Sequence, residues 1–180
     1  MELDTSSVVV AKPPSFFSEG ELQDFISMVR AGGEVGGKSL EDNVRGAERL
    51  VSVRRGECLV GVAALKRPRD DYRQDTQTKS GVDLAKTSFP FEFGYLFVLP
   101  SARRMGYAKK LSAAALAETE DIGVFATVRT SNKEMLAFIP TLGFAKRGKP
   151  YASRRGRYQL QVFVKEPTVW PGTALQQSIE

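Results

Sequence analysis

The chain has 180 residues, of which 42% are hydrophobic and 26% are charged, and its formal net charge is +5. It has no histidine and one cysteine, Cys58, which excludes Cys-His zinc sites, Ser-His-Asp triads and an internal disulfide, and we expect no metal site. No apolar run reaches about 18 residues and the start lacks a basic region followed by an apolar stretch, so we expect no membrane span or secretory signal and a cytoplasmic protein.

The first third of the chain predicts a strand, two helices and a hairpin. Ser18 is suited to cap a helix over residues 18–33, because Glu21 stands three residues on, as in a capping box. The apolar residues of this segment recur at helical spacing, at Leu22, Phe25, Ile26 and Val29. The other expected elements are a strand within 6–14, a short helix within 39–49, and hairpin strands at 49–53 and 58–65 around "RRGE".

Residues 66–86 are polar and charged and show no periodicity. This pattern predicts a long loop, and loops of such length in a compact protein are usually functional or disordered. We expect it to shape the pocket for an acceptor substrate.

The rest of the chain alternates strand-like and helix-like segments. The expected elements are strands at 91–99, 122–128, 144–151 and 157–165, and helices from about Arg104 to Glu118 and over 131–144. The order β-α-α-β-β-β-α-β-α-β-β predicts a mixed α/β fold. We expect a single domain over residues 1–165 and a C-terminal tail over 166–180.

A basic run covers residues 146–157, from Lys146 to Arg157, with six basic residues and no acidic one. Such a patch attracts phosphates, nucleic acid or an acidic protein, but it is also compatible with an ordinary solvated surface.

The stretch "VLPSARRMGYAKKL", residues 98–111, places arginines and small residues where a strand becomes a helix. A helix N-terminus presents unpaired backbone N–H groups and a positive dipole end. Gly106 and Ala108 let a ligand approach this backbone, and Arg103 and Arg104 add charge. Together they predict a phosphate-binding turn.

This turn resembles the acetyl-coenzyme-A binding motif of the GNAT superfamily of N-acetyltransferases, with Val98, Pro100, Arg103, Gly106 and Ala108 at the motif positions. A second motif of that family, a strand, an Asn at a helix start and a later Gly-Phe pair, is matched by Asn132, Gly143 and Phe144. The resemblance covers residues 89–165. It implies a mostly antiparallel sheet of six to seven strands, with the fourth and fifth strands splayed, flanked by about four helices.

The resemblance also implies acetyl-CoA as cofactor. Its pyrophosphate would rest on the amides of the turn beside Arg103, and its pantetheine arm would run along Phe97 and Val98 and contact Asn132. A backbone N–H near Val98 would polarise the thioester carbonyl. The residues implied in the turn itself are Arg104, Met105, Gly106, Tyr107 and Ala108.

Glu92 is the candidate general base. It interrupts the aromatic strand "FPFEFGYLF", where an acidic side chain is costly without a role or a partner. In the histone acetyltransferase branch of the family the base stands six residues before the motif Val, as Glu92 does before Val98. The alternative is a carboxylate at an exposed strand end or paired with an arginine.

The general acid departs from the family pattern, because Ile139 occupies the position of the usual Tyr and Pro140 should end or kink the helix there. Tyr95 and Tyr151 are candidate substitutes, and Tyr107, Ser131, water or unaided departure of the thiolate stay open. Cys58 is expected to be a buried small hydrophobe.

The leading hypothesis is an acetyl-CoA-dependent N-acetyltransferase acting by direct attack of an amine. The acceptor is open: a small molecule, a peptide, or a nucleic-acid amine recruited by the basic run from Lys146 to Arg157. Two alternatives are a CoA-binding regulatory module with little catalysis and a basic nucleic-acid-binding protein. A homodimer also stays open.

Overall fold

The computed structural model describes residues 6–33 and 39–168. The described helices are α1 (Glu19–Ala31), α2 (Leu40–Arg45), α3 (Asp70–Ser80), α4 (Tyr107–Leu116) and α5 (Lys133–Phe138). The described strands are β1 (Ser7–Lys12), β2 (Arg49–Arg55), β3 (Cys58–Lys66), β4 (Phe91–Val98), β5 (Val124–Arg129), β6 (Ala145–Ala152) and β7 (Gln159–Lys165). The hydrogen-bonded strand order is β1-β2-β3-β4-β5-β7-β6.

The sheet is mostly antiparallel, and its parallel pairing joins β4 to β5, with Phe91 opposite Val124 and Glu92 opposite Phe125. The predicted mixed α/β fold is therefore confirmed. Among the described helices, none is both long and apolar enough to cross a bilayer.

The chain divides into two compact units, and β4 contributes residues to both. Unit 1 comprises Met1–Arg67 and Phe93–Leu116, and unit 2 comprises Pro68–Glu92 and Ala117–Glu180. The expected single domain over 1–165 stays a prediction, and most of the expected tail, residues 169–180, lies outside the described residues.

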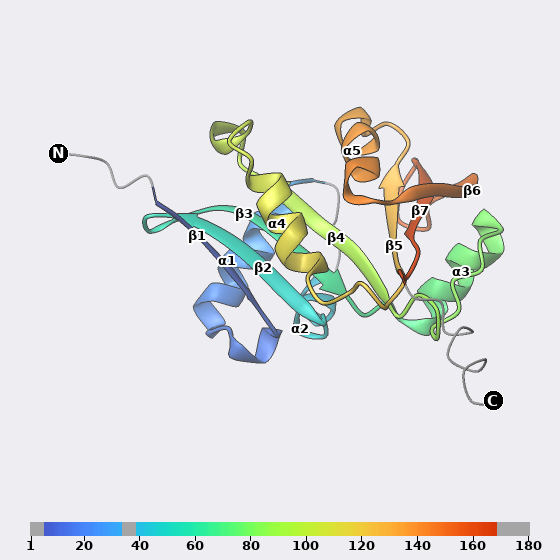
Figure 1. Cartoon of the computed structure of the whole chain (residues 1–180), viewed down its shortest axis with the longest axis horizontal. Helices are drawn as coiled ribbons and strands as arrows, with labels where there is room; N and C mark the ends of the chain where they lie inside the picture. Colours follow the sequence, from blue (N-terminus) through green and yellow to red (C-terminus); the bar gives the residue numbers. More distant parts are fainter. Residues whose placement is uncertain (1–5, 34–38, 169–180) are drawn as a thin grey trace, which may run out of the picture. The chain divides into compact units, whose positions relative to one another are not determined.

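In unit 1, helices cover both faces of the antiparallel strands β1, β2 and β3 (Figure 1). Successive residues of a strand point to opposite faces. Val62 joins the apolar cluster formed with α1 and α2, while its neighbour Gly61 faces Leu111 of α4. The four α1 residues predicted from helical spacing are buried there, and the predicted capping box of Ser18 and Glu21 is present.

Gly61 sets how closely α4 approaches the sheet. A Cβ at this position would lie 2.9 Å from Cδ1 of Leu111 and 3.1 Å from the carbonyl oxygen of Phe97. The first atom belongs to a side chain of α4 and the second to the backbone of strand β4, so a larger residue has to displace both. Gly61 therefore allows the middle of α4 to pack closely on β3.

Gly61→Val is expected to destabilise the protein by about 1–3 kcal/mol, the usual cost of overpacking. Gly20→Ala is the control, because a Cβ on Gly20 in α1 meets no atom within 4 Å. Urea unfolding of both variants and the wild type measures the effect. Equal stability of Gly61→Val and the wild type would contradict the close packing described here.

In unit 2, β5 pairs with β7 and β7 pairs with β6, all antiparallel, and α3 packs against β6. The β6–β7 register shifts between Arg147 and Tyr151. Gly148 lies in this irregularity with φ +63°, and a Cβ there would collide with the carbonyl oxygen of Ser80 at the end of α3. Glycine thus permits the close approach of β6 to α3.

Two sequence predictions are wrong. Residues 70–80 form α3 rather than part of a loop, with Asp70 and Asp71 in its first turn and Gly81 as a left-handed C-terminal residue. Cys58, expected to be buried, is exposed, because it is the first residue of β3 beside the hairpin turn.

Candidate active site

The backbone of β4 is irregular at its centre. Tyr95 has φ +55°, a conformation that non-glycine residues adopt at a cost of about 1–3 kcal/mol and that clusters at functional sites. A Cβ on the preceding Gly94 would lie 2.8 Å from Cε of Lys66. The strand therefore departs from regular geometry between Glu92 and Val98.

The Tyr95 ring belongs to the core of unit 1. It is buried in the cluster that also contains Phe25 and Val62, and the Lys66 ammonium lies 4.9 Å from the ring centroid. This placement gives Tyr95 a packing role, and its expected role as a proton donor stays a prediction.

Figure 1 shows the chain turning from β4 into α4. Two residues of this turn have left-handed backbone conformations. The Leu99 amide donates to the carbonyl of Val60 at 2.9 Å, which ties the end of β4 to β3. Arg104 then has φ +64° and Gly106 φ +79°. These two residues delay the helix, which starts at Tyr107 rather than near Arg104.

The start of α4 concentrates hydrogen-bond donors and positive charge. Lys110 N donates to the carbonyl of Gly106 at 3.1 Å, so the amides before Lys110 lie ahead of the first helical bonds. Arg103, Arg104 and Gly106 are exposed, and Arg103 Nε donates back to the Val98 carbonyl at 3.3 Å. No acidic residue occurs between residues 93 and 117.

This turn fits a diphosphate. A Cβ on Gly106 would meet no atom within 4 Å, so the backbone is open to a ligand, and a side chain at φ +79° would be strained. The helix dipole, the unpaired amides and two exposed arginines all favour an anion. The residues that the sequence assigned to the turn are thus brought together, with Phe97 half-buried and Val98 buried beside it.

Glu92 lies in a buried cluster of hydroxyl groups in unit 2. Its side chain is 3% exposed. Tyr72 Oη and Thr127 Oγ1 each donate to Glu92 Oε1 at 3.0 Å, and the two hydroxyl oxygens lie 3.1 Å apart. The alternative of an exposed carboxylate is thereby wrong, because buried hydroxyls solvate this group.

Both tyrosines near Glu92 keep their protons at neutral pH. Burial, and then the negative charge of Glu92, raise the pKa of Tyr72 well above its usual value. Burial raises the pKa of Tyr151 to about 12, and the charge of Glu92 contributes to this rise. The two phenols are therefore available as hydrogen-bond donors across the physiological range.

The Tyr151 side chain also lies near Glu92. It stands on β6 opposite Leu160, and its side chain is buried with Leu84 and Phe125. Its hydroxyl oxygen is buried and, within residues 6–33 and 39–168, forms no hydrogen bond of good geometry, although the Thr76 side chain lies near enough to interact with it. Buried hydroxyls are normally satisfied, so this one can donate to a ligand group in place of Thr76.

The sequence does not predict a site role for Tyr72, because residues 66–86 show no periodicity and predict a loop. Tyr72 is the lone aromatic residue between residues 66 and 88. Arg73 fixes its helix by donating to the carbonyls of Leu84, Phe89 and Pro90 at 2.8, 2.5 and 3.0 Å. A buried Glu92 requires a hydrogen-bond donor, and this requirement is the one signal in the sequence that points to such a residue. The sequence does not identify which residue donates.

The second family motif is a helix cap. Asn132 Oδ1 accepts a hydrogen bond from Met135 N at 3.0 Å, so the side-chain carbonyl of Asn132 caps the N-terminus of α5. The helix ends at Phe138 and continues as a 3-10 turn over Ile139–Leu142, which confirms the expected effect of Pro140. Ile139 is fully buried, so an apolar core residue occupies the position of the family tyrosine.

The basic run lies on β6 and the turn after it, with its basic side chains exposed. Arg147 pairs with Glu166 and Arg154 with Asp75, both at 3.8 Å. Charged residues on an edge strand also discourage edge-to-edge aggregation. These contacts favour a surface role over a dedicated binding site.

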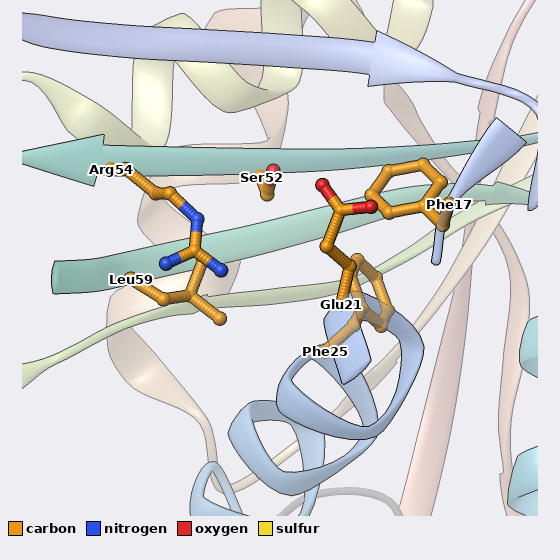
Figure 2. Close-up of a pocket in the computed structure, with 6 residues that line it drawn as sticks. All are labelled: Phe17, Glu21, Phe25, Ser52, Arg54 and Leu59. Atoms are coloured by element: carbon orange, nitrogen blue, oxygen red, sulfur yellow. The ribbon is translucent and has the colours of Figure 1, made fainter. Parts of the chain in front are cut away.

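A hollow on unit 1, shown in Figure 2, is lined by residues of α1, β2, β3 and the turn before α1. Its charged groups already have partners: Glu21 completes the capping box and lies 3.6 Å from Lys12, and Arg54 pairs with Asp24 at 3.2 Å. The lining residues are Phe17, Glu21, Phe25, Ser52, Arg54 and Leu59. The hollow therefore offers no unsatisfied charge to a ligand.

Known proteins share this fold. An acyl-CoA N-acyltransferase from Pseudomonas aeruginosa aligns with a TM-score of 0.64 at 13% identity, over 89% of this chain and 99% of that one. FeeM, an N-acyl amino acid synthase from uncultured soil microbes, gives 0.67 at 15% identity over 92% and 94%. Arabidopsis thaliana NAA60, solved with acetyl-CoA, gives 0.64 at 16% identity over 88% and 99%.

The solved structures, at these identities, establish the fold alone. No curated protein matches the chain significantly. A model of the acetyltransferase (GNAT) family, however, matches residues 20–144, which is more than half of the chain and includes residues of both units. The chain therefore belongs to the acetyltransferase (GNAT) family.

Proposed function

We propose that this protein is an acetyl-CoA-dependent N-acetyltransferase that uses Glu92 as its general base. The observation that carries the assignment is the buried Glu92 carboxylate, hydrogen-bonded by two hydroxyls, six residues before Val98 on the strand that leads into the anion-binding turn. Family membership supplies the reaction class. Solved relatives that are named for acyl-CoA or acetyl-CoA support the choice of thioester.

The turn before α4 would hold the pyrophosphate of acetyl-CoA. The donors are the amides of residues 104–108, and Arg103 and Arg104 supply countercharge. Phe97 and Val98 would present backbone groups to the pantetheine arm, and Asn132 would offer its side-chain amide. When bound, acetyl-CoA supplies a thioester carbonyl that an amine attacks and a thiolate that leaves.

Glu92 would remove the proton from the attacking amine, directly or through one water. A lysine-like amine has a pKa of about 10, so it is mostly protonated at neutral pH and cannot attack. The carboxylate accepts the proton as the new N–C bond forms, and no covalent bond to the enzyme is needed. The absence of histidine from the chain leaves a carboxylate as the natural choice.

Tyr151 would donate a hydrogen bond to the sulfur as negative charge develops there. Complete proton transfer from a phenol with a pKa of about 12 to a thiolate is uphill, because a thiol has a pKa of about 8.5. We therefore assign Tyr151 to charge stabilisation rather than to obligatory protonation. Many members of the family have a tyrosine for this role at the position that Ile139 occupies here. In this protein Tyr151 would take over the role of that tyrosine.

Tyr151→Phe is expected to lower kcat by about 10²-fold, the usual cost of losing one donor to a developing anion, and to leave the KM for acetyl-CoA unchanged. Tyr158→Phe is the matched control, because the Tyr158 ring packs against the Arg129 guanidinium, with 3.9 Å between the guanidinium carbon and the ring centroid. Among the causes that raise the pKa of Tyr151, the charge of Tyr158 is the smallest. Steady-state kinetics compare the two variants. Equal kcat values in both would remove Tyr151 from the mechanism.

The acceptor is proposed to be a primary amine of a small molecule or a polypeptide. FeeM is named as an N-acyl amino acid synthase, and another solved relative, from Escherichia coli, is named as an N-acetyltransferase of an alanine of ribosomal protein S18. A nucleic-acid acceptor and a homodimer, both considered from the sequence, gain no support from the described contacts or from these relatives.

The proposed function is tested by incubating the protein and acetyl-CoA with a panel of amino acids, polyamines and peptides. Free CoA is quantified with a thiol reagent, and the acetylated product is identified by mass spectrometry. At least one amine class should release CoA well above the rate without acceptor. Tight binding of CoA with no turnover of any amine would instead favour the binding module, the alternative that the buried Ile139 suggests.

A further inference from the structure

Tyr72 reaches Glu92 from a helix that lies between β3 and β4 in the chain. The inward face of α3 is polar, because its buried residues are Arg73, Thr76 and Ser80. Arg73 holds that face to the segment before β4 through three carbonyl groups. The helix thus presents the Tyr72 hydroxyl at a fixed place beside the carboxylate.

The three oxygens of Tyr72, Thr127 and Glu92 form a closed triangle with sides of 3.0, 3.0 and 3.1 Å. Two hydroxyl hydrogens are available for the three sides while Glu92 is ionised, and both can point at Oε1. When Glu92 gains a proton, the hydroxyls can rotate, because Tyr72 and Thr127 each accept as well as donate. The cluster therefore satisfies Glu92 in both protonation states.

We infer that Tyr72 is a positioning residue for Glu92, which with Thr127 fixes the orientation of the buried carboxyl group through hydrogen bonds to its Oε1. The role as a base rests on the proposed function, but the hydrogen-bonded triangle does not. Hydrogen bonds from hydroxyls stabilise a carboxylate more than a neutral carboxylic acid. Tyr72 thereby offsets part of the free-energy cost of burying the Glu92 carboxyl group.

Other groups also act on Glu92, and they define what a test must control. The Arg73 guanidinium on α3 and the Tyr151 phenol on β6 both interact electrostatically with the carboxylate. Tyr72→Phe keeps the ring and removes the donor while leaving Arg73 and Tyr151 in place. Thr127→Val removes the second donor at nearly constant shape, and Thr127→Ser restores it.

The test compares Tyr72→Phe, Thr127→Val, Thr127→Ser and the control Tyr158→Phe with the wild type in the whole protein by urea unfolding. Tyr72→Phe and Thr127→Val should each lower the urea midpoint, because each leaves the buried carboxyl group of Glu92 with one hydrogen bond fewer. Thr127→Ser and Tyr158→Phe should unfold like the wild type. An unchanged midpoint in both Tyr72→Phe and Thr127→Val would overturn the inference.

Steady-state kinetics separate this inference from the proposed function. If Glu92 is the base, Tyr72→Phe should lower kcat by about tenfold and leave the KM for acetyl-CoA unchanged, and it should have no further effect in Glu92→Gln. A lowered urea midpoint with a wild-type kcat would support the positioning role of Tyr72 and overturn Glu92 as the base. An unchanged urea midpoint would overturn the positioning role whatever the kinetics show.

Discussion

Replacing Glu92 with glutamine is expected to lower kcat by about 10²- to 10⁴-fold, the range typical of losing a general base. Glutamine keeps the shape of the side chain and an oxygen that accepts from Tyr72 and Thr127. The fold and the binding of acetyl-CoA should therefore be retained. Steady-state kinetics at saturating amine, with calorimetric binding of acetyl-CoA measured in parallel, check both halves of this expectation.

The acceptor provides an internal control for the Glu92→Gln result. An amine that is already unprotonated at neutral pH has less need of a base, so the loss in kcat should be smaller for it than for a lysine-like amine. Equal loss for both amines would indicate that glutamine distorts the site. Wild-type activity in Glu92→Gln would show that Glu92 serves only to fill a buried polar cluster.

Gly106→Ala is expected to weaken the binding of acetyl-CoA by about tenfold or more. The added methyl projects into the space that a diphosphate would approach. A side chain at φ +79° also costs about 1–2 kcal/mol, so the free turn can relax to another conformation that binding must reverse. Each 1.4 kcal/mol of lost binding energy is a factor of ten in Kd. Isothermal titration calorimetry with acetyl-CoA measures this change.

Gly81→Ala separates backbone strain from ligand contact. Gly81 closes α3 with φ +74°, nearly the same conformation, and a Cβ there also meets no atom within 4 Å. Both variants should lose similar stability, but only Gly106→Ala should bind acetyl-CoA more weakly. If the two variants bind acetyl-CoA equally well, the turn before α4 is not the binding site.

Much of the framework could be predicted because its signals are local. The capping box at Ser18, the apolar spacing of α1, the hairpin of β2 and β3 and the helix end before Pro140 each depend on residues within a few positions. The turn proposed to bind the pyrophosphate is also local, because Arg103 and Gly106 lie within one stretch between a strand and a helix.

The elements that the sequence did not reveal depend on distant partners. α3 buries Arg73, Thr76 and Ser80 rather than apolar residues, so it has no hydrophobic periodicity. The helix is held in place by hydrogen bonds from Arg73 to backbone carbonyl groups that come after α3 in the chain. The surroundings of Glu92 come from α3, β5 and β6, which are far apart in sequence. Cys58 was expected to be buried because it begins an apolar run. It is exposed, because it is the first residue of β3 and lies at the exposed end of that strand.

The central claim is that the backbone amides between β4 and α4 bind the pyrophosphate of acetyl-CoA. Amide NMR of the wild-type protein tests it directly, by titration with acetyl-CoA and, separately, with pantetheine, which has no pyrophosphate. The account predicts that acetyl-CoA produces its largest shifts at the amides of residues 104–108 and that pantetheine leaves these amides nearly unchanged. Saturable binding of acetyl-CoA that leaves the amides of residues 104–108 unshifted would contradict it.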